Sequence, residues 1–170
     1  DLPGIYDLHG FSDDEQVVRH FLANNTVDLV LIVANASQID RQLSLALQIK
    51  TLNLPAVLIL NMADEAKKSG ITINTEQLGH EIGFPTCLIS AKYGQGYADA
   101  YKTIESALKT SHATPAQELR EDFALDQEME TQLEDLVKHS VDFPTQIGHS
   151  LTEKIDKITL HPLLGLPLFF

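Results

Sequence analysis

The chain has 170 residues, of which 44% are hydrophobic and 21% charged, which is typical of one globular domain with an appendage rather than a disordered chain. Its net charge of -12 argues against a general nucleic-acid binder, because neutralising phosphates requires clustered Lys and Arg. The one cysteine, Cys87, excludes an intrachain disulfide and lies in an apolar run, where we expect a buried structural thiol.

Up to about residue 110, short apolar runs alternate with amphipathic stretches. The predicted strands cover 27–34, 56–61 and 86–90. The predicted helices cover 13–23, 40–52, 75–82 and 96–108. Strand-helix-strand order with this spacing predicts an α/β fold with a parallel sheet and flanking crossover helices.

After a linker at 110–115, the chain changes to helical periodicity with no convincing strand. An acidic helix is predicted over 116–140, ended by Phe143-Pro144, and another helix over 151–160. The last ten residues are apolar apart from His161. We expect them to be the start of a membrane-entry segment rather than a tail packed on the core.

The first motif with chemical meaning is Asp1-Leu2-Pro3-Gly4. An aspartate at a strand end can hold Mg²⁺ through water, and the glycine N–H can approach a terminal phosphate without a Cβ in the way. The same four residues also form an ordinary turn.

The second motif is Asn61-Met62-Ala63-Asp64, directly after a predicted buried strand. The carboxylate of Asp64 can accept hydrogen bonds from guanine N1–H and its exocyclic amine, a donor pair that adenine lacks. Asn61 would tie neighbouring loops together. The alternative is a polar helix start in which Asp64 is the N-cap.

The third motif, Ser90-Ala91-Lys92, follows the next predicted strand. A backbone N–H here can meet guanine O6, and Lys92 can cover the base. The alternative is a polar exit from the strand. Ligands bind at the carboxyl ends of strands in an open α/β sheet; the three motifs lie at the ends of predicted strands or at the start of the chain.

In combination the motifs are more specific than any one of them. About 57 residues separate Gly4 from Asn61 and about 26 separate Asp64 from Ser90. This order and spacing resemble the second half of a small GTPase domain. The resemblance implies a P-loop-NTPase-like parallel sheet, truncated at its N-terminus and followed by a small all-α appendage.

The sequence around the motifs is similar to that of the FeoB family of ferrous iron transporters. The stretches that carry the resemblance are Asp1 to Tyr6, Asp14 to Val18, Asp28 to Ala36, Leu60 to Ala66, Leu151 to Ile158 and His161 to Pro167. Met62 stands where most GTPases have Lys, and Met is common there in FeoB proteins. The resemblance is thin over 111–150.

This resemblance implies a partial GTPase domain at 1–110, an acidic helical domain at 111–150 and a junction into a transmembrane segment at 151–170. It implies GTP or GDP and Mg²⁺ as cofactors, the Mg²⁺ held by Asp1 through water. It also implies Fe²⁺ as the transported ion, the protein's own membrane permease domain and a homo-oligomer as partners, and the cytoplasmic face of the inner (plasma) membrane as location.

Three departures from the GTPase pattern limit these expectations. The Gly-rich phosphate loop and the switch-region threonine are absent, so residues 1–170 alone are expected neither to bind GTP tightly nor to hydrolyse it. Ile5 stands where Ras-like proteins place a water-orienting Gln, so the intact enzyme is expected to be slow. Met62 removes a cation near the base, which predicts modest affinity and rapid exchange.

Two other functions stay open. A soluble ribosome- or translation-associated small GTPase would need a basic RNA-binding appendage, which the acidic C-terminal part does not offer. A degenerate, non-binding interaction domain would follow if the upstream gene portion were missing. The DNA on either side of this segment would distinguish them.

Overall fold

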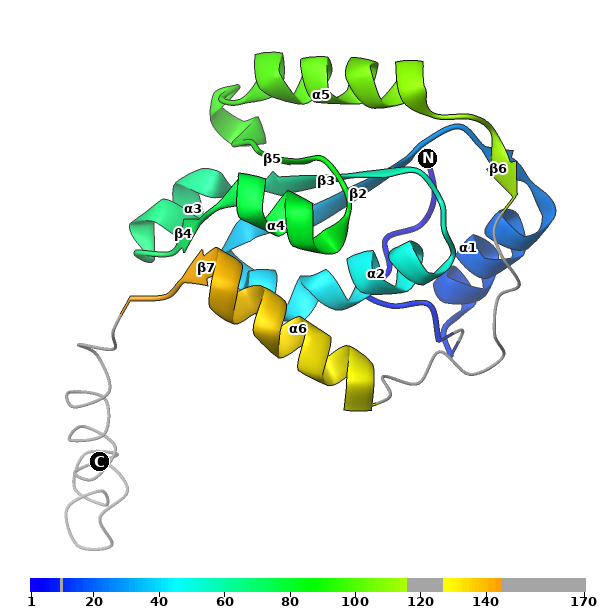
Figure 1. Cartoon of the computed structure of the whole chain (residues 1–170), viewed down its shortest axis with the longest axis horizontal. Coiled ribbons are helices and arrows are strands. Elements are labelled where there is room, and N and C mark those ends of the chain that lie inside the picture. The colour runs from blue at the N-terminus through cyan, green and yellow to red at the C-terminus, as the bar shows by residue number, and fades with distance from the viewer. Residues whose placement is uncertain (10, 116–126, 145–170) are drawn as a thin grey trace, which may run out of the picture.

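The computed structural model describes residues 1–9, 11–115 and 127–144 as layers built on a parallel sheet (Figure 1). The strands are β1 (Thr26–Val27), β2 (Val30–Asn35), β3 (Ala56–Asn61), β4 (Thr72–Ile73), β5 (Thr86–Leu88), β6 (Thr114–Pro115) and β7 (Val141–Asp142). The α-helices are α1 (Asp13–Asn24), α2 (Ile39–Thr51), α3 (Ala63–Lys68), α4 (Thr75–Ile82), α5 (Tyr97–Thr110) and α6 (Gln127–Ser140). The 3-10 helices are η1 (Ala36–Gln38) and η2 (Ala91–Tyr93).

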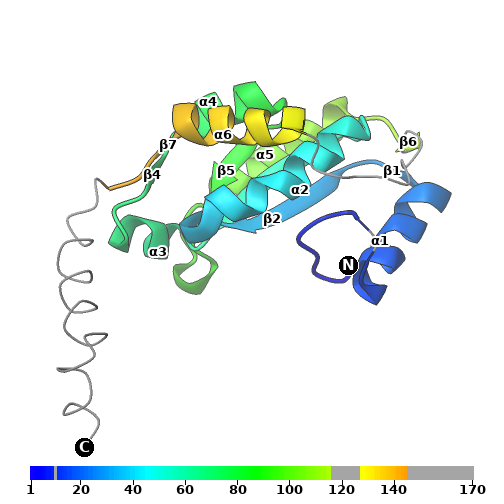
Figure 2. The ribbon, with the colours of Figure 1, turned by 90° about the horizontal axis from the view of Figure 1, so that it is seen from below.

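The central sheet has the order β2-β3-β5, and both pairings are parallel. β3 is buried along almost its whole length because helices cover both of its faces. α5 lies on one face, whereas α2 and α4 lie on the other, with α6 outside them (Figures 1 and 2). The α/β fold with a parallel sheet and flanking helices is therefore confirmed.

Local signals explain where several helices begin and end. Ser12 and Glu15 form a capping box that starts α1, and Asn74 caps α4 by accepting from the backbone N–H of Gln77. Gly83, in the left-handed conformation with φ of 83°, ends α4. The predicted helices at 13–23, 40–52, 75–82 and 96–108 are present; the bounds of 75–82 are as predicted, and no end of the others is shifted by more than two residues.

Two short antiparallel pairs depart from the sequence expectations. The predicted strand at 27–34 is interrupted: its first residue belongs to β1, which pairs with β6 inside the predicted linker. β7 follows α6 and pairs with β4, Ile73 lying opposite Val141, so the expectation of no strand after about residue 115 was wrong. Both pairs depend on partners distant in the sequence, which local periodicity does not reveal.

The acidic helix is part of the main body of the fold. α6 packs against α2 and α4, and its Leu136 is buried in the same core cluster as Leu43 and Leu78 (Figure 2). The predicted helix over 116–140 is present from Gln127, and its earlier part lies outside the described residues. So does the predicted segment 151–170. Among the described residues, none of the helices has both the length and the apolar character that crossing a membrane requires.

Candidate functional site

Polar residues gather at one edge of the sheet because the parallel strands end there together. Asn35 at the end of β2 is aligned with Asn61 at the end of β3. Ile89, just after β5, exchanges backbone hydrogen bonds with β3 and its exit: its N–H donates to Leu60 O and its carbonyl accepts from Ala63 N. These bonds bring the loop that starts at Ser90 against the loop that starts at Asn61.

Asp64 and Ser90 form the central contact of this edge. The Ser90 hydroxyl donates to Asp64 Oδ1 at 2.5 Å, and Ser90 is only 1% exposed. This hydrogen bond lowers the pKa of the Asp64 carboxyl, outweighing the opposite effect of partial burial; Lys68 and Lys92 lower the pKa further by their charge. Asp64 is therefore a carboxylate of fixed orientation at neutral pH.

Asn61 joins the two loops through one oxygen. Its Oδ1 accepts from the backbone N–H of Met62 at 2.8 Å and from that of Ala91 at 3.0 Å. Met62 is held in the left-handed conformation, with φ of 62°, which is uncommon for a residue with a side chain. Backbone strain of this kind is concentrated at functional sites, where neighbouring contacts maintain it.

Met62 also determines where α3 begins. It is the N-cap, so Asp64 lies in the first turn and is not the cap. A carboxylate in the first turn is favoured by the helix dipole, in a helix of only six residues. The alternative role for Asp64 as a capping residue is thus excluded by the backbone.

The loop from Ser90 to Gly96 is closed tightly on the sheet. Ser90 and Gln95 exchange backbone hydrogen bonds of 3.0 and 3.2 Å, and the Tyr97 hydroxyl donates to Ala91 O at 3.4 Å. Gly96 has φ of 79°, and an added Cβ would collide with the carbonyl oxygen of Leu88. Lys92 lies exposed beyond this loop, its Nζ 5.2 Å from the centre of the Tyr93 ring.

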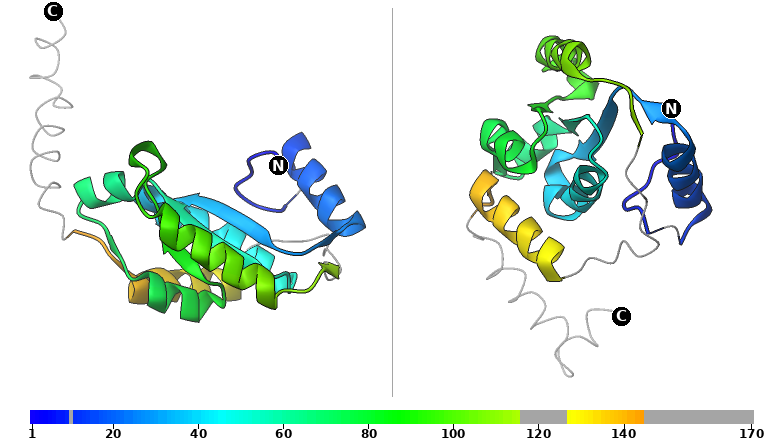
Figure 3. Two further views of the ribbon diagram at one scale, coloured as in Figure 1. Left: turned by 90° about the horizontal axis from the view of Figure 1, so that it is seen from above. Right: turned by 45° about the vertical axis from the view of Figure 1, so that its right-hand side comes forward.

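The structure does not bring Asp1 to Gly4 into this contact. In Figures 1, 2 and 3 the N-terminus lies toward α1, at the end of the molecule away from α3. Asp1 is exposed and is followed by a segment without regular structure, and its place at a strand end stays a prediction. Asn61, Met62, Ala63 and Asp64 thus meet Ser90, Ala91 and Lys92, while Asp1, Leu2, Pro3 and Gly4 lie apart.

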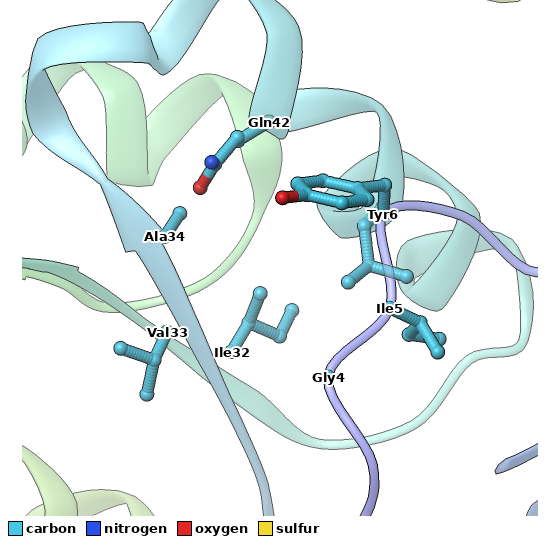
Figure 4. Close-up of a pocket in the computed structure, with 8 residues that line it drawn as sticks. Gly4, Ile5, Tyr6, Ile32, Val33, Ala34 and Gln42 are labelled. Carbon is cyan, nitrogen blue, oxygen red and sulfur yellow. The ribbon is translucent and has the colours of Figure 1, made fainter. Parts of the chain in front are cut away.

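Gly4 nevertheless lines a cavity beside β2. The cavity, of about 250 Å³, is formed by Gly4 to Tyr6 on one side and by Ile32 to Ala34 and Gln42 on the other (Figure 4). Gln42 Oε1 also accepts from the N–H of Asn35 at 2.6 Å, at the same sheet edge as Asn61. Figure 4 shows Gly4 beside Ile32 in the middle of β2, whereas Tyr6 lies nearer to Gln42.

Sequence reasoning missed one polar residue near this segment. Gln48 on α2 is fully buried, and its Oε1 accepts from the N–H of Leu8 at 2.8 Å. Its only local signal is a glutamine among the apolar positions of an amphipathic helix, beside the buried Leu47 and Ile49.

Comparison of the chain with known proteins identifies its family. The sequence model described as "Ferrous iron transport protein B" matches residues 1–104. A relative from Synechocystis sp., described as "Fe(2+) transporter FeoB", is 46% identical over 175 residues, which cover 100% of this chain and 28% of the relative. The chain belongs to the FeoB family. This FeoB chain therefore spans less than a third of the curated relative's length.

Solved FeoB structures agree with the fold. The FeoB G-domain from Methanococcus jannaschii is 35% identical with a TM-score of 0.61, over 64% of this chain and 70% of that one. The cytosolic domain of T. maritima FeoB, in its GMPPNP form, has a TM-score of 0.72 over 84% of this chain and 80% of that one. It is 20% identical and supports the fold alone.

Within the described part of this FeoB chain, no three or more His, Cys, Asp or Glu side chains are grouped to hold a metal ion. A protein-only cage is not required for Mg²⁺, which in nucleotide sites takes one or two carboxylates and completes its shell with phosphates and water. Asp1, the carboxylate expected to hold Mg²⁺, is exposed.

Proposed function

We propose that this chain is the guanine-nucleotide-binding part of a ferrous iron transporter and recognises the base of GTP and GDP through Asp64. The observation that carries the proposal is the hydrogen bond from Ser90 to Asp64, together with the Asn61 oxygen that joins the two loops. Membership of the FeoB family supports the same ligand.

The geometry favours guanine over adenine for a chemical reason. Asp64 is an ionised acceptor with Oδ1 held by Ser90, so the plane of the carboxylate is set before a ligand arrives. Guanine offers N1–H and an amine side by side, whereas adenine would leave the carboxylate facing an acceptor. Lys92 is exposed beside the loop, where its side chain can lie over the base.

At the phosphate end, Asp1 would hold Mg²⁺ through water, and Gly4 would donate its N–H to the terminal phosphate. The ion would neutralise phosphate charge during hydrolysis by the intact protein. A base edge and a terminal phosphate are at opposite ends of a nucleotide, so Asp1 and Asp64 need not touch.

The face of β2 that points away from α2 is exposed, which is evidence for an upstream segment that completes the site. Leu31 and Val33 are 46% and 64% exposed there, while Ile32 and Ala34 on the α2 side are buried. α5 covers β3 and β5 but leaves this face of β2 open. We infer that a preceding strand and helix, carrying the phosphate loop, cover it, and that residues 1–170 alone do not hydrolyse GTP.

Transport of Fe²⁺ through the protein's own permease domain, at the cytoplasmic face of the plasma membrane, completes the proposal. A route for coupling begins at the Asn61 loop. Asp64 lies in the first turn of α3, β4 is the next element after α3, and β4 pairs with β7 just before Pro144. The ribosome-associated alternative is not favoured by the family match.

An exchange of base specificity tests the proposal. The chain, extended by the upstream sequence of its gene, would be titrated with fluorescent GDP, ADP and XDP. Wild type should prefer GDP. In Asp64→Asn the side chain can donate to the carbonyl that xanthine carries in place of the amine, so preference should move to XDP by about a hundredfold or more.

Asp135→Asn is the matched control, because it makes the same chemical change at an exposed position of α6. Its preference should remain that of wild type. If the extended wild type binds GDP and ADP equally, or if Asp64→Asn keeps its preference for GDP, Asp64 does not read the base and the proposal fails.

A further inference from the structure

Gln48 is a fully buried polar side chain that contacts the segment after Gly4. It projects from α2 into the core, and its Oε1 accepts from the backbone N–H of Leu8 at 2.8 Å. Because a backbone N–H can donate only to the oxygen of the amide, this contact determines the orientation of the side chain. Gln48 thus links two parts of the chain that are 40 residues apart.

The peptide groups around Leu8 are held from several directions. The Leu8 side chain is 0% exposed in the main core cluster. The Leu8 carbonyl accepts from Arg19 Nη1 on α1, and the same nitrogen reaches His9 O at 3.5 Å. Leu8 is therefore a fixed point four residues beyond Gly4.

The segment before this fixed point is much less constrained. Asp1, Leu2, Gly4 and Tyr6 are all exposed, and a Cβ added at Gly4 would meet no atom within 4 Å. Ile5, next to Gly4, packs against the core but is only partly buried, so Leu8 is the first fully buried residue after Gly4. We expect a shift at Leu8 to be passed to the Gly4 N–H, whereas the loops of Asn61 and Ser90 are held by hydrogen bonds of their own.

Only the oxygen of the Gln48 amide has a hydrogen-bond partner among the described residues. Its Nε2 is buried and has no acceptor among the described residues. An unpaired buried donor destabilises the fold, so a residue present only for packing would serve better as Met or Leu.

We propose that Gln48 is a positioning residue: it anchors Leu8 so that the Gly4 N–H can reach the terminal phosphate of GTP. This rests on the proposed guanine-nucleotide function. Because GDP lacks that phosphate, Gln48 should affect binding of the triphosphate and leave binding of the diphosphate unchanged.

The test uses the chain extended by its upstream sequence and the substitution Gln48→Met, which keeps the length of the side chain and removes both amide groups. Affinities for fluorescent GDP and for a non-hydrolysable GTP analogue would be measured side by side. The GDP affinity should stay within about twofold of wild type, while the GTP-analogue affinity should fall about tenfold, the value of one well-placed hydrogen bond.

Gln77→Met is the matched control, since Gln77 is an exposed glutamine on α4 whose Nε2 contacts Glu81. It should leave both affinities unchanged. Equal losses for both nucleotides in Gln48→Met, or no loss for either, would overturn the inference. If extended wild type binds no guanine nucleotide, the proposed function itself has failed.

Arg19→Met provides a second variant in case Gln48→Met does not fold. Arg19 holds the Leu8 carbonyl from a partly exposed position on α1, so its loss should disturb the same peptide with less effect on the core. It should show the same selective loss of affinity for the triphosphate. If the ratio of GTP-analogue affinity to GDP affinity is the same in Arg19→Met as in wild type, the proposal is also contradicted.

Discussion

Ser90 and Asp64 come from different loops, and the serine hydroxyl reaches the carboxylate at 2.5 Å. Ser90 is almost fully buried, whereas the Asp64 side chain retains 16% exposure at the edge of the sheet. The buried hydroxyl therefore orients an acceptor that a ligand can still approach. This division explains why a small polar residue is required at the end of β5.

Ser90→Ala should weaken guanine-nucleotide binding without unfolding the protein. The substitution removes the donor that orients Asp64 and leaves the backbone bonds between Ser90 and Gln95 in place. We expect roughly a tenfold loss of GDP affinity in the extended chain, measured by fluorescence titration. Ser106→Ala, on α5 away from these loops, should bind GDP as wild type does. Unchanged affinity in Ser90→Ala would mean that the hydroxyl does not position Asp64.

The lowered pKa of Asp64 predicts a specific dependence of stability on pH. A carboxyl whose pKa is lower in the folded state contributes stability that is present above its ordinary pKa of 3.8. That contribution is lost as the pH falls through the lowered value. The difference in unfolding free energy between wild type and Asp64→Asn should therefore be constant near neutral pH and shrink in acid.

Urea denaturation of this chain at a series of pH values measures that difference. The comparison is then repeated between Ser90→Ala and the double variant that carries both Ser90→Ala and Asp64→Asn. Because the Ser90 hydroxyl is the largest cause of the lowered pKa, the difference should shrink by less on going to acid, and should finish shrinking at a higher pH, in this background. Identical pH profiles in the two backgrounds would show that the hydroxyl does not stabilise the ionised form.

Gly96 and Gly94 offer a matched test of the loop that carries Ser90. Both have positive φ, of 79° and 66°, so alanine is strained at either position. Only at Gly96 does an added Cβ also collide with Leu88 O, whereas at Gly94 it meets nothing within 4 Å.

Gly96→Ala should therefore destabilise the protein by about 1–3 kcal/mol more than Gly94→Ala, from the overpacking alone. It should also weaken nucleotide binding in the extended chain, since the displaced loop holds Ser90. Thermal unfolding and GDP titration of both variants provide the measurements. Equal destabilisation by the two substitutions would contradict the close approach of Gly96 to β5.

The central sheet was predictable because its strands are marked locally. Residues 56–61 form an apolar run between Pro55 and the polar Asn61, and β3 covers that span. The contact between the loops of Asn61 and Ser90 followed from one rule, that parallel strands end at the same edge of a sheet. Sequence reasoning thus predicted that these two loops lie together.

Other features depend on contacts between distant residues and left no local mark. β4 and β7 have two residues each and exist because they pair with each other. Gln48 was missed because its role depends on Leu8, a partner that helical periodicity does not indicate. The position of Asp1 to Gly4 also depends on neighbours, since that segment has no regular structure of its own.

Leu136 tests whether the acidic helix forms a separate domain, as the boundary predicted at residue 111 implies. Leu136 is 5% exposed on α6 and is buried in the same cluster as residues of α2 and α4. Leu136→Ala should destabilise the protein by about 2–5 kcal/mol and keep a single cooperative transition in urea. Leu108→Ala makes the same change where the side chain is 48% exposed on α5, and it should destabilise the protein far less.

If α6 were an independent unit, Leu136→Ala would instead produce an early transition, seen by circular dichroism, and leave unfolding of the sheet unchanged. A single shifted transition would show that α6 folds together with the sheet.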